Sequence, residues 1–253
     1  MAPAISADSR NFKLIIEYDG SDYHGWQRQA RDRSIQQEIE TALRTMTGRS
    51  VTLFGSGRTD AGVHALGQAA NFHCMTRMTP DALQKGLNSL LPLDIVIREC
   101  APVPSSFHAR YAAKSKRYRY AILNSPLRPA VGRAYVWWIR APLDLASMRE
   151  ALPYLIGVHD FRSFEGTGSP RQHTVRHVTQ AELETGGDGR ILFHIEANGF
   201  LRFMVRNIVG TLVMIGQGKM APQAIEEILS SRDRRRAGAT APAQGLCLMQ
   251  VNY

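Results

Sequence analysis

The segment from Gly55 to His64 places a carboxylate and a guanidinium close together in a turn that contains three glycines. It reads Gly-Ser-Gly-Arg-Thr-Asp-Ala-Gly-Val-His, so that Arg58 stands two residues before Asp60. Glycine tolerates positive φ angles and close backbone approach, which allows the turn to present Asp60 on a sharp loop. A carboxylate presented in this way can perform nucleophilic or acid–base chemistry on a large substrate.

Two common nucleotide-binding loops do not fit this spacing. A P-loop has four residues between its glycines and continues as Gly-Lys-Ser/Thr, a pattern that is missing here. A dinucleotide-binding turn requires glycine at the position of Asp60, where a carboxylate would repel a pyrophosphate. On spacing alone, an ordinary turn with a solvated aspartate is the favoured interpretation, because Asp and Gly are frequent in turns.

A second charged side chain, Arg206, stands at the edge of a long apolar stripe. The residues from Leu201 to Ile215 follow helical spacing, with Arg202 and Arg206 one turn apart. We expect the Arg206 guanidinium to be partly buried, and a buried cation requires a carboxylate or phosphate partner. The sequence therefore predicts that Arg206 pairs with Asp60 and keeps it ionised. The alternative is that its long stem carries the guanidinium out to water.

A predicted strand at 114–123 interleaves basic and aromatic residues. One of its faces carries Lys116, Tyr118 and Tyr120, and the other carries Arg117 and Arg119. Rings that stack on bases and cations that meet phosphates are typical of proteins that bind single-stranded RNA. An ordinary sheet with half-buried tyrosines explains the pattern equally well.

The bulk composition favours a polyanionic partner. The 253 residues include 31 Lys and Arg against 22 Asp and Glu, which gives a formal charge of +9. Nucleic acid is the leading candidate and an anionic membrane surface the lesser one. No apolar run reaches membrane-spanning length, and Met1 to Arg10 contain no hydrophobic signal core, so we expect a cytoplasmic protein. The 3 cysteines are scattered as expected of reduced thiols, and no spacing predicts a metal site.

The elements that must position these residues follow one order in the first half of the chain. We expect strand, helix, strand, strand, helix and strand at 12–18, 35–46, 50–54, 67–74, from Thr79 onward, and at 94–99. Ser34 with Gln37 predicts a capping box at the first helix, which Gly48 ends, and Thr79 with Pro80 predicts the start of the second. This order is that of a ferredoxin-like unit.

The second half repeats the order less clearly. Its elements are expected at 114–123, 144–156, 178–184, 191–197, 201–215 and 245–253. We therefore predict an α+β protein of two ferredoxin-like halves, related by a pseudo-two-fold axis, whose mostly antiparallel sheets flank a central basic cleft. Residues 1–10 are expected to form a flexible tail, 11–108 an N-terminal domain with Asp60, and 109–253 a C-terminal domain with Tyr118 and Arg206.

Seven motifs, in their order and spacing, closely resemble those of the tRNA pseudouridine synthase A family. They run from about residue 12 to the last residue, and no key position departs from the family pattern. The matching segments are Glu17–Gly20, Gly25–Gln29, Gly57–His64, Phe107–Arg110, Arg117–Tyr120, Met204–Gly210 and Gly245–Leu248.

The resemblance implies that the chain isomerises uridine to pseudouridine in the anticodon stem-loop of tRNA, at positions 38 to 40. It also implies a homodimer with one tRNA lying across both subunits, and a reaction without cofactor or metal. The family's catalytic aspartate corresponds to Asp60, its active-site tyrosine to Tyr118, its partner arginine to Arg206 and its base-displacing arginine to Arg58. Further substrate-binding residues are expected at Arg110 and Lys116.

Several alternatives remain open at this stage. Asp60 can attack C1′ of the nucleoside, as in covalent glycosyl catalysis, or help to expel uracil and abstract a proton at C2′. A non-catalytic RNA-binding protein fits the basic aromatic strand but leaves the Arg-Thr-Asp turn unexplained. A base methyltransferase would need a nucleotide-cofactor loop and often a cysteine near Asp60, and neither is present. A membrane-surface protein is disfavoured because no amphipathic basic helix stands out.

Overall fold

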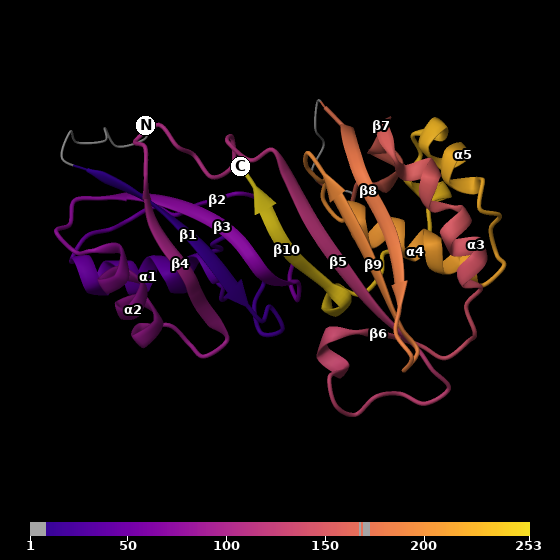
Figure 1. Cartoon of the computed structure of the whole chain (residues 1–253), viewed down its shortest axis with the longest axis horizontal. Helices are drawn as coiled ribbons and strands as arrows, with labels where there is room; N and C mark the ends of the chain where they lie inside the picture. The colour runs from indigo at the N-terminus through magenta and orange to yellow at the C-terminus, as the bar shows by residue number, and fades with distance from the viewer. Residues whose placement is uncertain (1–8, 167, 169–172) are drawn as a thin grey trace. The chain divides into compact units, whose positions relative to one another are not determined.

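The computed structural model describes residues 9–166, 168 and 173–253. The chain divides into two units, of which unit 1 comprises Met1–Lys114 and Leu248–Tyr253, and unit 2 comprises Ser115–Cys247. Most of the expected tail at residues 1–10 lies outside the described residues, and the first strand begins at Arg10. Both units combine helices with mostly antiparallel strands, so the mixed α+β class is confirmed (Figure 1).

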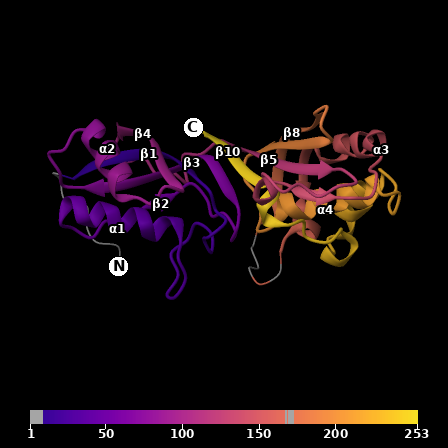
Figure 2. The ribbon, with the colours of Figure 1, turned by 90° about the horizontal axis from the view of Figure 1, so that it is seen from below.

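Unit 1 holds a sheet with the strand order β4-β1-β3-β10, and β2 pairs with β3. Strand β1 is antiparallel to both of its neighbours, β3 and β4. Helix α1 contacts α2, and α2 contacts β4 (Figure 2). The elements are β1 (Arg10–Tyr18), α1 (Ile35–Thr47), β2 (Phe54–Gly55), β3 (His64–Cys74), α2 (Pro80–Leu90), β4 (Ile95–Val103) and β10 (Leu246–Asn252), whose first two residues belong to unit 2.

Local sequence signals explain why these elements begin and end where they do. Alternate residues of β1 are buried from Phe12 to Tyr18, as the predicted strand requires. Helix α1 ends at Gly48, which adopts the left-handed φ of 67°. Helix α2 begins with Pro80, and the Thr79 hydroxyl accepts a hydrogen bond from the Ala82 amide.

The predicted capping box at the start of α1 is wrong. Ser34 is the N-cap residue, but its side chain makes no cap hydrogen bond. The first amides of the helix instead donate to backbone carbonyls of the preceding loop, Ile35 N to Gly25 O at 3.3 Å and Gln36 N to Trp26 O at 3.0 Å. These bonds satisfy amides that a helix start leaves without intrahelical partners, and they tie α1 to that loop.

Unit 2 holds an antiparallel sheet with the order β5-β9-β8-β7, and the short β6 runs parallel to β5. Three helices accompany it, of which α4 is buried over almost its whole length. The elements are β5 (Ser115–Asn124), β6 (Trp137–Ile139), α3 (Leu145–Glu150), β7 (Gly157–Asp160), β8 (Val175–Thr185), β9 (Arg190–Ala197), α4 (Met204–Gly216) and α5 (Ala224–Ser231).

The observed elements differ from the expected ones in several places. The helix predicted at 144–156 ends at Glu150 and continues as a 3-10 turn over Leu152–Leu155, because Pro153 lacks the amide that an α-helix needs. The strand predicted at 50–54 is reduced to Phe54–Gly55. Strands β6 and β7 and helix α5 were not expected.

The division into units also differs from the expected limit between residues 108 and 109. The segment after residue 108 is attached to unit 1, because the Ala109 amide donates to Asn71 Oδ1 at 2.8 Å. The chain's last residue returns to the same place, and its Tyr253 hydroxyl donates to the Ala109 carbonyl at 2.9 Å. Residues 248–253, expected in the C-terminal domain, thus belong to unit 1.

Candidate active site

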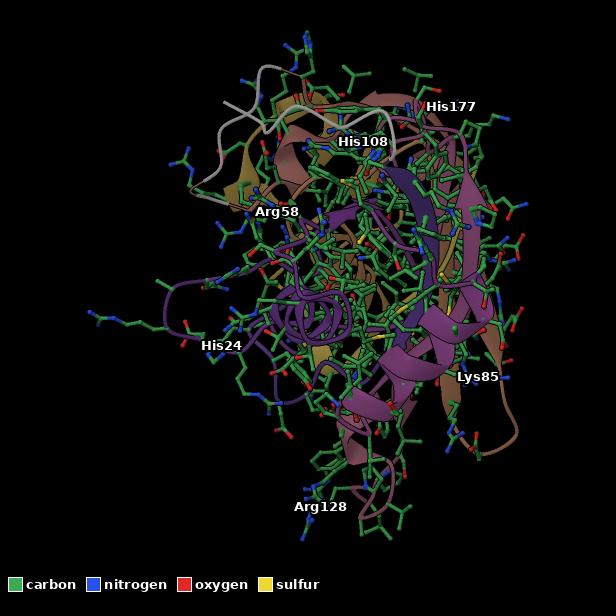
Figure 3. The ribbon with its side chains drawn as sticks, turned by 90° about the vertical axis from the view of Figure 1, so that its left-hand side faces the viewer. His24, Arg58, Lys85, His108, Arg128 and His177 are labelled. Carbon is green, nitrogen blue, oxygen red and sulfur yellow. The ribbon has the colours of Figure 1, made fainter. Side chains whose placement is uncertain are left out.

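Asp60 lies in the turn between β2 and β3, within unit 1. The turn closes locally because the Val63 amide donates to the Asp60 carbonyl at 3.2 Å, and Gly62 supplies a positive φ of 76°. Asp60 is half-buried, whereas Arg58 is exposed at the surface (Figure 3). The two charged residues of the motif therefore share one turn but differ in their access to solvent.

The loop before α1 packs directly against the backbone of this turn. Trp26 N donates to Thr59 O at 3.1 Å, and Gly62 N donates to Tyr23 O at 3.2 Å. A Cβ atom on Gly25 would lie only 2.4 Å from Thr59 O, so the two backbones fit together only because residue 25 has no side chain. Since α1 holds this loop through Gly25 and Trp26, the turn with Asp60 is braced by a helix.

Buried side chains hold the rest of the turn. The hydroxyl oxygens of Tyr18 and Thr59 lie 2.8 Å apart and share a hydrogen bond. Ser56 Oγ donates to Gln68 Oε1 at 2.7 Å, and Gln68 Nε2 donates to Gly57 O at 3.1 Å. Gln68 is 0% exposed, so these bonds are shielded from water. The turn is thus fixed on both sides of Arg58.

Tyr18, Gly25 and Gln68 support the turn although they were not predicted as site residues. One signal was available, because Gln68 is a polar residue in a predicted strand whose neighbours are glycine and alanine. His64, the last residue of the motif, also supports this region. Its Nδ1 accepts from Gly20 N at 3.1 Å and lies 3.0 Å from Asp19 Oδ1.

Tyr118 belongs to β5 in unit 2, and its ring is 8% exposed. It stands opposite Ile195 of β9 and meets the Phe200 ring edge-on, with centroids 5.0 Å apart. Tyr120, on the same face of the strand, is fully buried, and its hydroxyl donates to Pro242 O at 2.8 Å. Burial raises the pKa of Tyr120. Of the two interpretations of this strand, the ordinary sheet therefore describes Tyr120, because the core encloses its ring.

Arg206 lies in the first turn of α4 and is half-buried, as its position in the apolar stripe predicted. Its Nε donates to the Ala241 carbonyl at 2.7 Å, which fixes the direction of the guanidinium. The guanidinium carbon lies 4.9 Å from the centroid of the Phe203 ring, and that of Arg202 lies 4.6 Å from the same ring. One aromatic ring thus meets two cations.

Phe203 holds an unusual backbone conformation just before α4. Its φ of 60° is left-handed, which costs a residue with a side chain of this size about 1–3 kcal/mol. A Cβ atom on Gly166 would lie 2.3 Å from the Phe203 ring, so the ring fits at this position only because residue 166 has no side chain. Backbone strain of this kind occurs often at functional sites. It fixes the start of α4, and hence Arg206.

The remaining candidate residues lie in both units. Arg110 is exposed in unit 1, and its amide donates to His108 Nδ1 at 3.1 Å. Lys116 is half-buried on β5 of unit 2, opposite Ala197. Asp60, Arg58 and Arg110 are therefore residues of unit 1, and Tyr118, Lys116 and Arg206 are residues of unit 2.

Two further properties concern ligands and thiols. Among the described residues, no group of three or more His, Cys, Asp and Glu side chains is placed to hold a metal ion. None of the helices in these parts of the chain is long and apolar enough to span a membrane. Cys74 and Cys247 are buried, and burial raises the pKa of Cys100 to about 11.

Comparison with known proteins gives matches over almost the whole chain. A family model described as tRNA pseudouridine synthase matches residues 14–112 and 151–253. A protein named tRNA pseudouridine synthase A from Thermoanaerobacter sp. (strain X514) is 47% identical over 244 residues, which cover 96% of this chain and 100% of the relative. Proteins of the same name from Acetivibrio thermocellus and Geotalea uraniireducens are 48% and 46% identical over the same length and with the same coverage.

Proposed function

The chain belongs to the tRNA pseudouridine synthase family, and from this premise we propose that it converts uridine to pseudouridine in tRNA with Asp60 as the essential carboxylate. The target uridines of this proposal lie in the anticodon stem-loop, at positions 38, 39 and 40. The observation that carries the proposal is the motif from Gly57 to His64, whose turn holds a half-buried Asp60 between a helix-braced loop and buried polar side chains. A carboxylate held in this way keeps one position relative to a bound nucleoside.

The reaction requires no change of oxidation state. The N1–C1′ bond of uridine breaks, the uracil rotates, and a C5–C1′ bond forms, while the C5 proton is lost and N1 gains a proton. Asp60 either attacks C1′ to form a covalent intermediate or assists the departure of uracil with loss of a C2′ proton. In both versions Asp60 must be ionised when the N1–C1′ bond breaks.

Arg206 is proposed to supply the positive charge that keeps Asp60 ionised. Two observations support this role. Arg206 is half-buried, and the hydrogen bond from its Nε to Ala241 O holds the guanidinium in one direction. A partly buried cation gains most from a carboxylate partner, because desolvation otherwise opposes its charge.

Arg58 and Tyr118 are proposed to handle the displaced nucleoside. Extruding a base from its stack costs a few kcal/mol, and the exposed Arg58, two residues from Asp60, can occupy the vacated space. Tyr118 is proposed to contact the uracil and to help remove the C5 proton. Its edge-on contact with Phe200 supports this role, because it holds the ring in a fixed orientation. Arg110 and Lys116 are proposed to bind tRNA phosphates.

The finer architecture and the partners also belong to this proposal. We propose that units 1 and 2 are two ferredoxin-like halves and that the protein has a basic cleft that binds tRNA. In unit 1, the order of β1, α1, β2, β3, α2 and β4 along the chain and the pairing of β1 with β3 and β4 support this plan. A homodimer in the cytoplasm, with one tRNA lying across both subunits, completes it.

Release of tritium from tRNA labelled at uracil C5 tests the proposed function. The purified protein, with no added cofactor, should release tritium and leave pseudouridine in the anticodon stem-loop. We expect Asp60→Asn to abolish release while tRNA affinity stays nearly unchanged, since the amide keeps the shape of the side chain but loses its charge. An active Asp60→Asn enzyme would refute the role of Asp60, and a wild-type protein that binds tRNA without releasing tritium would indicate a pure RNA-binding protein.

A further inference from the structure

Three aromatic rings form a connected ladder on unit 1. The centroid of the His108 ring lies 5.2 Å from that of Phe54 and 4.4 Å from that of Tyr111. Tyr111 is 78% exposed and Phe54 is 39% exposed. Burial lowers the pKa of His108, which favours the neutral form of its ring. Figure 3 labels this side chain. This aromatic ladder (Phe54, His108 and Tyr111) therefore presents uncharged ring surface to solvent.

The backbone under the ladder is held firmly by two buried asparagines. Asn11 and Asn71 are 2% and 1% exposed. Asn11 Nδ2 donates to Phe107 O at 2.9 Å, and Asn71 Oδ1 accepts from Ala109 N at 2.8 Å. The Tyr253 hydroxyl completes the attachment at the Ala109 carbonyl. A surface that is already ordered loses little conformational entropy when it binds a partner.

A cation accompanies the exposed end of the ladder. The guanidinium carbon of Arg110 lies 5.8 Å from the centroid of the Tyr111 ring, and its side chain is exposed. Ring faces that stack on bases, next to cations that pair with phosphates, are the means by which proteins bind unpaired nucleotides. The overall charge of +9 favours a polyanion over a neutral partner.

We propose that the aromatic ladder is a platform on which an unpaired base of the tRNA stacks, while Arg110 pairs with a neighbouring phosphate. The proposal rests on the proposed function in that it takes tRNA as the substrate. Phe54 is the residue before the turn that begins at Gly55, so one ring of the ladder is directly joined along the chain to the turn with Asp60. The platform contributes to holding the tRNA and leaves the chemistry to other residues.

Substitutions at Tyr111 test the platform, because they distinguish an effect of the aromatic ring from an effect of apolar surface alone. Stacking of a base on an aromatic side chain changes affinity by about 5- to 150-fold. With the full-length protein and an unmodified tRNA transcript at constant salt, Tyr111→Leu should weaken binding roughly tenfold. Tyr111→Phe, which keeps the ring, should bind as the wild type does. Leu93→Ala, a change at a still more exposed position of unit 1, is the control and should bind normally.

Two further measurements complete the test. The melting temperature should be nearly the same for all these variants, because residue 111 is mostly solvent-exposed. The logarithmic salt dependence of binding should become less steep by about one unit in Arg110→Gln and stay unchanged in Tyr111→Leu.

Wild-type affinity for tRNA in Tyr111→Leu would overturn the platform proposal. An equal loss of affinity in Tyr111→Phe and Tyr111→Leu would also overturn it, because the effect would then belong to the hydroxyl group. A change in sedimentation without a change in affinity would show that the ring contacts a second copy of the chain, which also overturns it. The proposed function fails separately, if the wild-type protein releases no tritium. Tritium release with unchanged affinity in Tyr111→Leu refutes the platform alone.

Discussion

Substitution of Gly25 by alanine should displace the turn that carries Asp60, although residue 25 is far from residue 60 in the sequence. The new Cβ would lie 2.4 Å from Thr59 O, whereas an ordinary contact begins at 3.4 Å, so the turn must move by about 1 Å. A misplacement of about 1 Å at a reacting group can lower the rate roughly 100-fold. The positive φ of 90° at this position adds a loss of folding stability of about 1–2 kcal/mol. We therefore expect kcat for tritium release to fall by about two orders of magnitude.

Gly48 provides the matched control for this substitution. It also has a positive φ, 67°, but no atom lies within 4 Å of the place that its Cβ would occupy. Gly48→Ala should therefore lose a similar amount of stability, measured by thermal or urea unfolding, and keep its kcat. If Gly25→Ala retains a kcat within a few-fold of Gly48→Ala, the steric brace does not position Asp60 and the reasoning fails.

Two other predictions concern charge. Arg206→Lys should lower kcat severely, because lysine has no Nε donor for Ala241 O and cannot form the forked pairing of a guanidinium. A near-normal rate of tritium release in this variant would refute the proposed ion pair with Asp60. Binding of tRNA should weaken as salt rises, with a log–log slope of roughly −0.7 to −0.9 for each phosphate neutralised. An affinity that does not depend on salt would contradict a basic binding surface.

Elements with strong local signals could be predicted from the sequence. The alternation from Phe12 to Tyr18, the left-handed end at Gly48 and the Thr79-Pro80 start are properties of neighbouring residues, and the structure confirms all three. The short strands β6 and β7 have no such signal, because they exist only through pairing with strands elsewhere in the chain. Pro153 was a visible signal against a long helix, and the prediction at 144–156 overlooked it.

In the candidate site, too, the sequence predicts local features but not contacts between residues that are far apart along the chain. The turn with Arg58 and Asp60 stands out in the sequence because its glycines and charged residues are adjacent. Its supports do not, because the hydrogen bond between Tyr18 and Thr59 joins residues 41 positions apart, which one sequence cannot reveal. The left-handed Phe203 could not be predicted either, since aromatic residues rarely adopt a positive φ and local preference points the other way.

The assignment of residues 248–253 to unit 1 has a consequence for biosynthesis. The ribosome releases β1 to β4 long before β10, so β3 must wait for a neighbour that is translated after β5 to β9. Until then, the part of β3 around Gly67, which packs against Met249, remains an open strand edge and a template for wrong pairing. Unit 2 is continuous in sequence, so all of its residues are synthesised before residues 248–253, which complete unit 1. The N-terminal half of the protein is therefore the last to be completed.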